Sequence, residues 1–254
     1  MSTIEIVEDT FTCHQEEDMA VFKILAGAKI LSTTVSGKDA FMEAFSEIRA
    51  AQDIKGVAFL YSSEYQGVDE HEKYINKIME EMKKVERRHS MIFRNAIIQY
   101  LETIHTFPKP IVGGMDGDIA PQSFATNLAF DLRIATDKTN FILPDLKYGL
   151  PPSPPLSFHL SHSLGPLKAS ELVLTKTKIT AKEALDLGLL TQVVSKENLK
   201  DSCINELRKL TAISSDALIE SRRMLKPSMK KMHEYIDEGF EGIIKCLYRM
   251  RKSS

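Results

Sequence analysis

The feature that most constrains the fold is an alternation of short strand-like segments and helical segments along the first two thirds of the chain. Residues 21–25 (VFKIL) and 57–61 (VAFLY) are compact runs rich in β-branched or aromatic side chains. Between them, residues 39–52 space apolar side chains three and four positions apart, which is a helical period. Strands separated by helices predict an α/β fold with a largely parallel sheet and crossover helices.

Further segments continue this alternation. Residues 110–112 and 132–135 are strand candidates, and residues 121–130 between them are interpreted as a short buried helix in which Pro121 suits the first helical position. Residues 70–106 contain no Gly or Pro and predict a helix. His89 and Ser90 are the candidate point for a break in it.

Two further segments predict a helix start and an exposed helix face. Ser36, three residues before Asp39, is a candidate helix start. The charge cluster MEEMKKVERR, residues 79–88, is interpreted as a solvated helix face, with a basic binding patch as the alternative.

The last third of the chain changes character and predicts an almost entirely helical region. Thr180 and Glu183 have the spacing of a capping box, and Gly188 is placed to end that short helix. Residues 207–225 and 229–250 carry further amphipathic pattern. We therefore divide the chain into an α/β core, residues 1–194, and a helical C-terminal region, residues 195–254.

Composition excludes several classes of protein. The 254 residues include 33 Lys and Arg against 35 Asp and Glu, so no global basic field exists to hold a nucleic acid. The three cysteines, Cys13, Cys203 and Cys246, fit neither a disulfide framework nor a CxxC metal site, which favours a reducing compartment. The acidic N-terminus does not resemble a signal peptide, and no apolar run approaches the ~20 residues that span a bilayer. We expect a soluble cytoplasmic protein with no membrane partner.

Common catalytic signatures are absent from the sequence. His159 and His162 are three residues apart, but no nearby carboxylate or cysteine completes a metal set, so we expect no metal site. The sequence has no HExxH, GxSxG, GxGxxG or P-loop pattern. The sequence therefore lacks the usual motifs of metallopeptidases, serine hydrolases, dinucleotide enzymes and NTPases.

One long stretch of motifs resembles a known family. FPKPIVGG (residues 107–114) leads through MDGD to LAFDLRIA (residues 128–135), then to Phe141, Pro144-Asp145 and a KYGL loop. A downstream segment, residues 169–194, and the tetrapeptide QGVD, residues 66–69, continue the pattern. Over about residues 20–250 the chain resembles the enoyl-CoA hydratase/isomerase (crotonase) superfamily. The resemblance implies a spiral of ββα units with two roughly perpendicular sheets and a helical C-terminal part that packs in trimerisation.

The resemblance also implies an oxyanion hole made of two backbone N–H groups, which here belong to Val68 and Gln122. These donors would stabilise negative charge on a thioester carbonyl, the second with help from the dipole of a helix N-terminus. Pro121-Gln122-Ser123 replaces the family's triple glycine. The Gln122 side chain could therefore partly fill the hole or reshape it for another ligand. Alternatively, the segment is a helix start without an oxyanion role.

The acid/base positions implied by the resemblance are also altered. The first of two family glutamates aligns with Ala125 and the second with Asp145. Hydration of a double bond needs both groups, whereas a single carboxylate can move a proton between two carbons. The pattern favours an enoyl-CoA isomerase-type reaction catalysed by Asp145. Three alternatives stay open: a catalytically silent binding or assembly protein, a decarboxylase or hydrolase acting on a carrier-bound thioester, and Asp145 as a loop cap or surface acid.

Substrate contacts follow from the same resemblance. Gly67, Lys29, Pro144 and Pro152 are candidate substrate-binding residues, although Lys29 could also be a solvated lysine. The prolines after Gly149 replace a glycine-rich family loop and predict a rigid pocket wall. We expect an acyl-CoA or carrier-bound acyl thioester as partner, no separate cofactor, and a homotrimer or a dimer of trimers.

Overall fold

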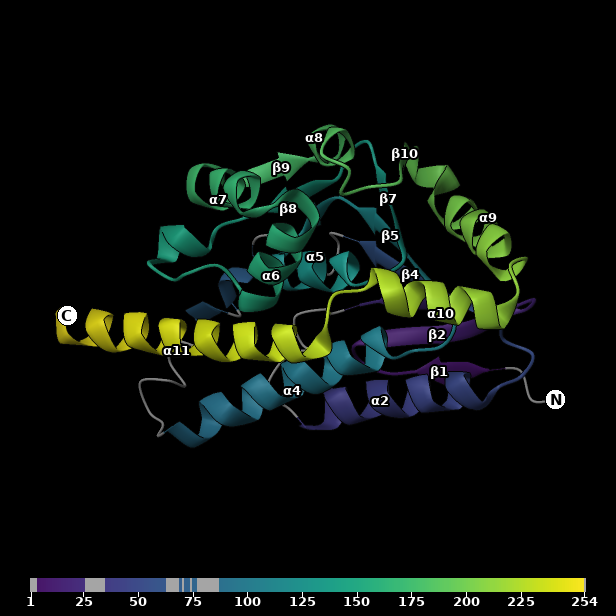
Figure 1. Ribbon diagram of the computed structural model, residues 1–254, viewed down its shortest axis with the longest axis horizontal. Helices are drawn as coiled ribbons and strands as arrows, with labels where there is room; N and C mark the ends of the chain where they lie inside the picture. Colours follow the sequence, from purple (N-terminus) through teal and green to yellow (C-terminus); the bar gives the residue numbers. More distant parts are fainter. Residues whose placement is uncertain are drawn as a thin grey trace.

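The computed structural model describes residues 4–25, 35–62, 69, 71–73, 75–76 and 87–253. Strands and helices alternate along this part of the chain, and helices dominate after residue 195 (Figure 1). The strands are β1 (Glu5–Val7), β2 (Phe11–Glu16), β3 (Met19–Ile24), β4 (Gly56–Ser62), β5 (Ile111–Asp116), β6 (Asp118–Ile119), β7 (Leu132–Thr136), β8 (Asn140–Ile142), β9 (Lys178–Thr180) and β10 (Gln192–Val194). The α-helices are α2 (Val35–Ala50), α4 (Arg87–His105), α5 (Pro121–Leu128), α6 (Pro154–Leu164), α7 (Pro166–Thr175), α8 (Ala181–Asp186), α9 (Leu199–Thr211), α10 (Ser215–Leu225) and α11 (Met229–Ser253). Two 3-10 turns are η2 (Asp145–Tyr148) and η3 (Lys196–Asn198).

The described strands form two sheets. The larger has seven strands in the order β1-β2-β3-β4-β5-β7-β10, and the smaller has three in the order β6-β8-β9. Neighbouring strands are parallel from β3 to β10, as the sequence predicted, whereas β1, β2 and β3 pair antiparallel. The mixed α/β class and the second sheet are therefore confirmed.

Alternating side chains of the central strands divide the core into two layers. Phe22 and Phe59 stack with ring centroids 4.7 Å apart and belong to the large cluster that includes side chains of α2 and α4. Val21 and Ala58, each one position away, belong to the second cluster, which includes side chains of α9. This is the two-residue period of a strand buried on both faces. The helices therefore sandwich the large sheet (Figure 1).

Two adjacent glycines of β5 allow close packing on both faces. A Cβ atom at Gly113 would lie 2.1 Å from Asn127 Oδ1 of α5, and one at Gly114 would lie 2.8 Å from Cys203 Sγ of α9. Both distances are far below normal contact, so side chains here would displace a neighbouring helix. Gly113 thus allows the close approach of α5 to one face of the sheet, and Gly114 that of α9 to the other.

Most predicted helices are confirmed. The segment that begins at Pro121 forms α5, all eight residues of which are buried, with the proline in the first turn. Thr180 and Glu183 form both hydrogen bonds of a capping box at the start of α8. Gly188 follows with a φ of 72°, in the left-handed region that favours glycine.

The local structure differs from the sequence prediction at two places. His89 and Ser90 do not break a helix, since α4 runs continuously from Arg87 to His105. The C-terminal third is almost entirely helical, as predicted, with β9 and β10 as short strands that join the two sheets. The antiparallel β1 and β2 had no counterpart in the sequence prediction. Their mixed polar and apolar residues give no long apolar run.

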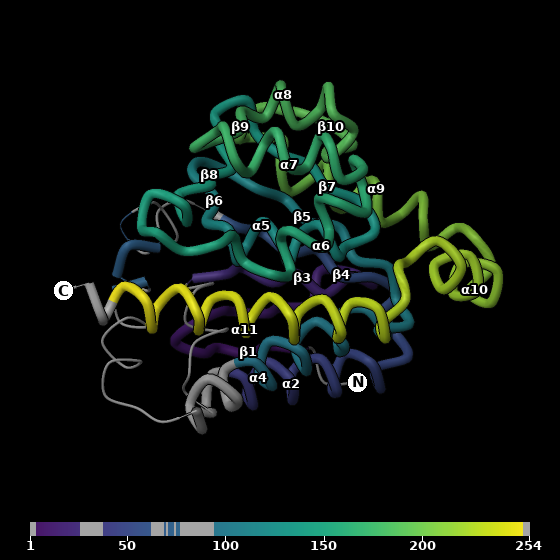
Figure 2. Tube along the Cα trace, turned by 60° about the vertical axis from the view of Figure 1, so that its left-hand side comes forward, coloured from purple at the N-terminus to yellow at the C-terminus, as the bar shows by residue number. Residues whose placement is uncertain are grey.

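The last helix lies along the body of the molecule and contacts the segment after β8. In Figure 1, α11 runs along the long axis, whereas α10 stands away from the body in Figure 2. A Cβ atom at Gly239 of α11 would lie 2.6 Å from Cβ of Pro154, so glycine is required for this close approach. Within the described ranges, no helix combines the length and apolar character needed to cross a membrane.

Candidate active site

Three buried polar side chains from distant parts of the chain meet in one cluster. His71 Nε2 lies 3.1 Å from Asp145 Oδ1, and His71 Nδ1 lies 3.2 Å from Gln122 Oε1. The imidazole is 0% exposed, and Asp145 and Gln122 are 6% and 7% exposed. Each ring nitrogen therefore faces a side-chain oxygen, with one on either side of the histidine.

Asp145 is held by the loop that follows β8. Pro144 precedes it at the start of η2, and Asp145 is the buried residue of that turn. The backbone N–H of Ser153 donates to Asp145 Oδ2 at 3.3 Å. Prolines occupy both positions before Ser153 and both after it, so this N–H is the one donor in a run of five residues. The carboxylate is thus directed into the protein, and its interpretation as an exposed surface acid is wrong.

Gln122 lies in the first turn of α5, where a helix leaves backbone N–H groups without intrahelical partners. The first backbone hydrogen bond of the helix runs from Phe124 N–H to the Ala120 carbonyl. The helix therefore makes no use of the Gln122 N–H, which suits it to bind an anion or an oxyanion. The Gln122 side chain is directed to His71.

A second pair of side chains borders the histidine. The Tyr148 ring centroid lies 6.4 Å from that of His71, and the Tyr148 hydroxyl donates to Glu72 Oε1 at 2.5 Å. Partial burial and the hydrogen bond to Glu72 raise the pKa of Tyr148 to about 12. The phenol therefore stays protonated at neutral pH and ties η2 to the helical residues 71–73.

The structure brings together part of the predicted site. Gln122 and Asp145 are linked through His71, and Ala125 is buried in α5 where a second acid was sought. Gly67, Val68 and Lys29 lie outside the described residues. Pro144 and Pro152 flank Asp145 in the chain, and their role as substrate contacts stays a prediction.

Sequence reasoning missed His71. The available signal was its position two residues after QGVD, the tetrapeptide that aligns with the expected oxyanion segment. No local pattern connects His71 with residues 51 and 74 positions further along the chain.

A second buried ionic cluster lies at the amino ends of β5 and β7. Asp131 Oδ2 accepts from the Ile111 N–H at 2.8 Å, and Asp131 Oδ1 accepts from Arg222 Nε at 2.8 Å. Lys226 Nζ lies 3.6 Å from the same Oδ1 atom. Burial, opposed by the nearby Asp131 carboxylate, lowers the pKa of Lys226 to about 8. This cluster joins α10 to the large sheet.

His159, one of the two histidines that lie three residues apart, is close to Lys226 and Arg133. Burial and then the charge of Arg133 lower the pKa of His159 to about 3. The His162 ring stacks on Phe158 at 6.3 Å between centroids. Among the described residues, no group of three His, Cys, Asp or Glu side chains could hold a metal ion.

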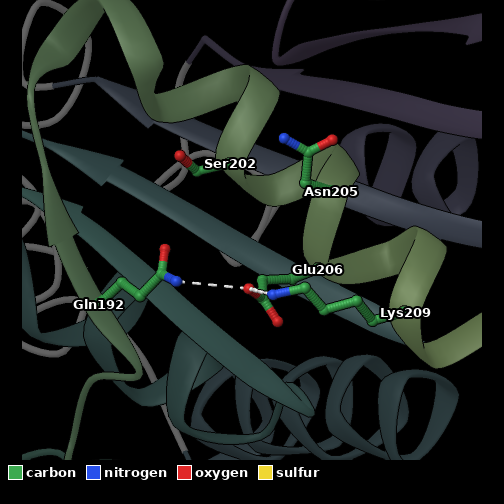
Figure 3. A pocket seen from close by; sticks show the side chains of 5 residues that line it. All are labelled: Gln192, Ser202, Asn205, Glu206 and Lys209. Carbon is green, nitrogen blue, oxygen red and sulfur yellow. Dashed lines mark hydrogen bonds and ion pairs between the residues drawn. The ribbon is translucent and has the colours of Figure 1, made fainter.

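A hollow of about 420 Å³ lies between β10 and α9, lined by Gln192, Ser202, Asn205, Glu206 and Lys209 (Figure 3). Glu206 Oε1 accepts from Lys209 Nζ at 2.6 Å and from Gln192 Nε2 at 3.3 Å. Three of the five lining side chains thus bond one another. The hollow contains no histidine or cysteine, and we assign no chemistry to it.

Comparison with known proteins identifies the family. The family model for enoyl-CoA hydratase/isomerase matches residues 75–242. That range covers more than half of the chain, and it includes Gln122 and Asp145. The chain therefore belongs to the enoyl-CoA hydratase/isomerase family, as its motifs indicated.

Two curated relatives carry different activities in their names. The chain is 33% identical over 137 residues to a trans-2-decenoyl-[acyl-carrier-protein] isomerase of Streptococcus mutans, covering 53% of this chain and 51% of the relative. It is 31% identical over 135 residues to a carnitinyl-CoA dehydratase of Salmonella arizonae, covering 53% and 51%. The matches thus span about half the length of these relatives.

Solved structures show the same fold. An enoyl-CoA hydratase from Bacillus halodurans superposes with a TM-score of 0.76 at 16% identity, covering 94% of this chain and 95% of the other. A probable enoyl-CoA hydratase from Mycobacterium thermoresistibile gives a TM-score of 0.75 at 16% identity, covering 97% and 100%. At this identity the likeness establishes the crotonase fold.

Proposed function

We propose that this chain is an acyl-thioester enzyme that moves a double bond by proton transfer, with Asp145 as its base. The observation that carries the proposal is the inward, buried carboxylate of Asp145, joined through one histidine to the first turn of α5. A carboxylate and a helix N-terminus held together are the two elements that enolate chemistry needs.

The proposed reaction uses these groups in two steps. Asp145 takes a proton from the carbon next to the thioester carbonyl, and the electron pair of that C–H bond moves onto the carbonyl oxygen. The backbone N–H groups of Gln122 and, by family resemblance, Val68 stabilise the resulting oxyanion. Asp145 then returns the proton to the carbon two positions further along as the double bond shifts. Each carboxylate oxygen has two lone pairs, so the bonds from His71 and Ser153 leave Asp145 able to accept the proton.

Isomerisation is favoured over hydration because an alanine stands where the family resemblance places one of the two acids that hydration requires. Ala125, at the alignment position of the other glutamate, has no titratable group and is 3% exposed. The relative named as an isomerase of a carrier-bound decenoyl group supports a medium-chain acyl thioester, carried by either CoA or acyl carrier protein.

The test is an assay of the purified chain with 3-enoyl thioesters of increasing length on both carriers, together with saturated and β-carboxylated thioesters. We expect isomerase turnover that falls by about 10²–10⁴-fold in Asp145→Asn. Glu206→Gln is the matched control, because it makes the same acid-to-amide change at another buried carboxylate, and it should retain full activity. Equal turnover by Asp145→Asn refutes the role of Asp145, whereas hydrolysis or decarboxylation would replace isomerisation as the reaction.

The buried Ala125 also favours a second candidate, a silent family member that binds a thioester without turning it over. Calorimetry with CoA and a medium-chain acyl-CoA separates the two functions. Tight acyl-CoA binding without any turnover supports the silent protein, and absence of binding argues against CoA as the carrier. The expected homotrimer or dimer of trimers stays a prediction that light scattering after size-exclusion chromatography can check.

A further inference from the structure

We infer that His71 is a positioning residue that holds the Asp145 carboxylate in its working orientation and draws the Gln122 side chain away from its own backbone N–H. This inference rests on the proposed function, because it assigns Asp145 and the Gln122 N–H the roles given above. It concerns a residue that is buried and contacts both of them.

The arrangement of ring nitrogens determines what His71 can do. An ionised carboxylate only accepts hydrogen bonds, so Nε2 must carry the proton that is shared with Asp145 Oδ1. Nδ1 is occupied by the Gln122 carboxamide. With both nitrogens directed at side chains of the protein, the ring acts on a substrate through Asp145 and not by direct contact.

Gln122 suits its place beside Nδ1 because a carboxamide has both a donor and an acceptor end. With Oε1 toward the ring, it accepts from a protonated Nδ1, and after a 180° rotation its NH₂ group donates to a neutral one. The carboxamide can therefore hold His71 in either charge state. A glycine at this position, as in the family pattern, would offer the imidazole no partner.

The contact between His71 and Gln122 also bears on whether the glutamine side chain fills the predicted oxyanion hole. A glutamine in place of glycine introduces a side chain beside the N–H that would bind the thioester carbonyl. His71 binds that side chain at its amide end, 3.2 Å from Nδ1. One histidine thus contacts both the acid and the glutamine side chain, so it can orient the first and hold the second.

Four variants test the inference. His71→Leu removes both hydrogen bonds, His71→Gln retains a donor and an acceptor, and Gln122→Met removes the carboxamide at similar length. His159→Phe is the matched control, since it replaces another buried histidine that has no assigned role at the site. Each variant is assayed for kcat and KM with the best 3-enoyl thioester.

We expect His71→Leu to lower kcat by about 10²-fold while KM changes by less than about threefold, because a misdirected base slows the chemical step more than binding. His71→Gln should recover about tenfold of that loss. Gln122→Met should reduce kcat less than His71→Leu does, and His159→Phe should match the wild type. Unchanged kcat in His71→Leu, or equal losses in His71→Leu and His159→Phe, would overturn the inference.

A measurement without substrate keeps this outcome separate from failure of the proposed function. The ring nitrogens of ¹⁵N-histidine-labelled protein report the proton on Nε2 and the partner of Nδ1. We expect Asp145→Asn to shift the His71 Nε2 signal and Gln122→Met to shift the Nδ1 signal. If the wild type turns over no thioester, the proposed function fails, and His71 signals insensitive to both variants would then overturn the positioning role as well.

Discussion

Asp131 and Asp145 are two carboxylates of similar burial, with side chains 11% and 9% exposed, that meet very different partners. Asp131 faces two cations and a backbone N–H at the amino ends of the sheet strands. Asp145 faces one imidazole and one backbone N–H beside the first turn of α5. The always-charged Arg222 guanidinium, together with the backbone N–H and the Lys226 amine, makes the first a structural cross-link. Within the described part of the chain, the Asp145 carboxylate has only an imidazole and a backbone N–H as partners, which fits the role of base that we propose for it.

The largest effect on stability is expected at Asp131, the structural carboxylate. Asp131→Asn leaves Arg222 and Lys226 buried without a negative partner, which should lower the free energy of unfolding by about 3–5 kcal/mol. Urea denaturation at neutral pH measures this loss. The remaining folded protein should retain wild-type kcat, and a loss below about 1 kcal/mol would contradict the structural role.

Lowering the pH should first destabilise the region around His159. The pKa of His159 is about 3 in the folded protein, below its ordinary 6.5, so the unfolded chain binds more protons as the pH falls through 6.5. This group's contribution is complete above that pH and is lost below it, by about 2 kcal/mol near pH 5. Urea titrations at several pH values should show this loss in the wild type and a shallower one in His159→Phe. Parallel pH profiles for the two proteins would exclude His159 as the cause.

A smaller change in stability is expected at the other acid. Asp145→Asn keeps one acceptor oxygen for His71 and should cost only about 1 kcal/mol of unfolding free energy. Activity should nevertheless be lost. Asp131→Asn should do the opposite, because it lowers stability and leaves kcat unchanged. Thermal and urea unfolding measure the first quantity and thioester turnover the second. Destabilisation as large as that of Asp131→Asn would remove the distinction between the two carboxylates.

The smallest effect is expected in the hollow between β10 and α9. Lys209 is 69% exposed, so its ion pair with Glu206 is well solvated. Glu206 is buried, but Glu206→Gln leaves only a solvated cation without its partner, so the unfolding free energy should change by less than about 1 kcal/mol. The same denaturation series provides the measurement, and a larger loss would mean that Glu206 belongs with the structural acids.

The sequence predicted those parts of the fold that local patterns specify. The apolar runs of β3 and β4, the proline that opens α5 and the capping box of α8 are each visible within a few residues. The hairpin of β1 and β2 depends on pairing with β3 and has no strong local signal. The same holds for β9 and β10, which are three residues long and are defined by their partners.

Only part of the candidate site could be predicted, because local patterns do not reveal contacts between distant segments. Motif spacing led to Gln122 and Asp145, but spacing alone does not show which way a side chain points. His71 is one of seven histidines in the sequence, and only the folded chain brings it to the other two residues. The sequence-based concern about the glutamine side chain therefore needed a contact between distant segments to resolve it.

The tight contact between Gly239 and Pro154 connects the C-terminal helix with the loop that holds the Asp145 carboxylate. A methyl group at position 239 would push α11 away from Pro154, whose neighbour Ser153 supplies a hydrogen bond to Asp145. Under the proposed function, a substitution in α11 would therefore alter turnover by displacing Ser153. Divergence within the family can in that case begin in the scaffold, before any residue of the candidate site is replaced.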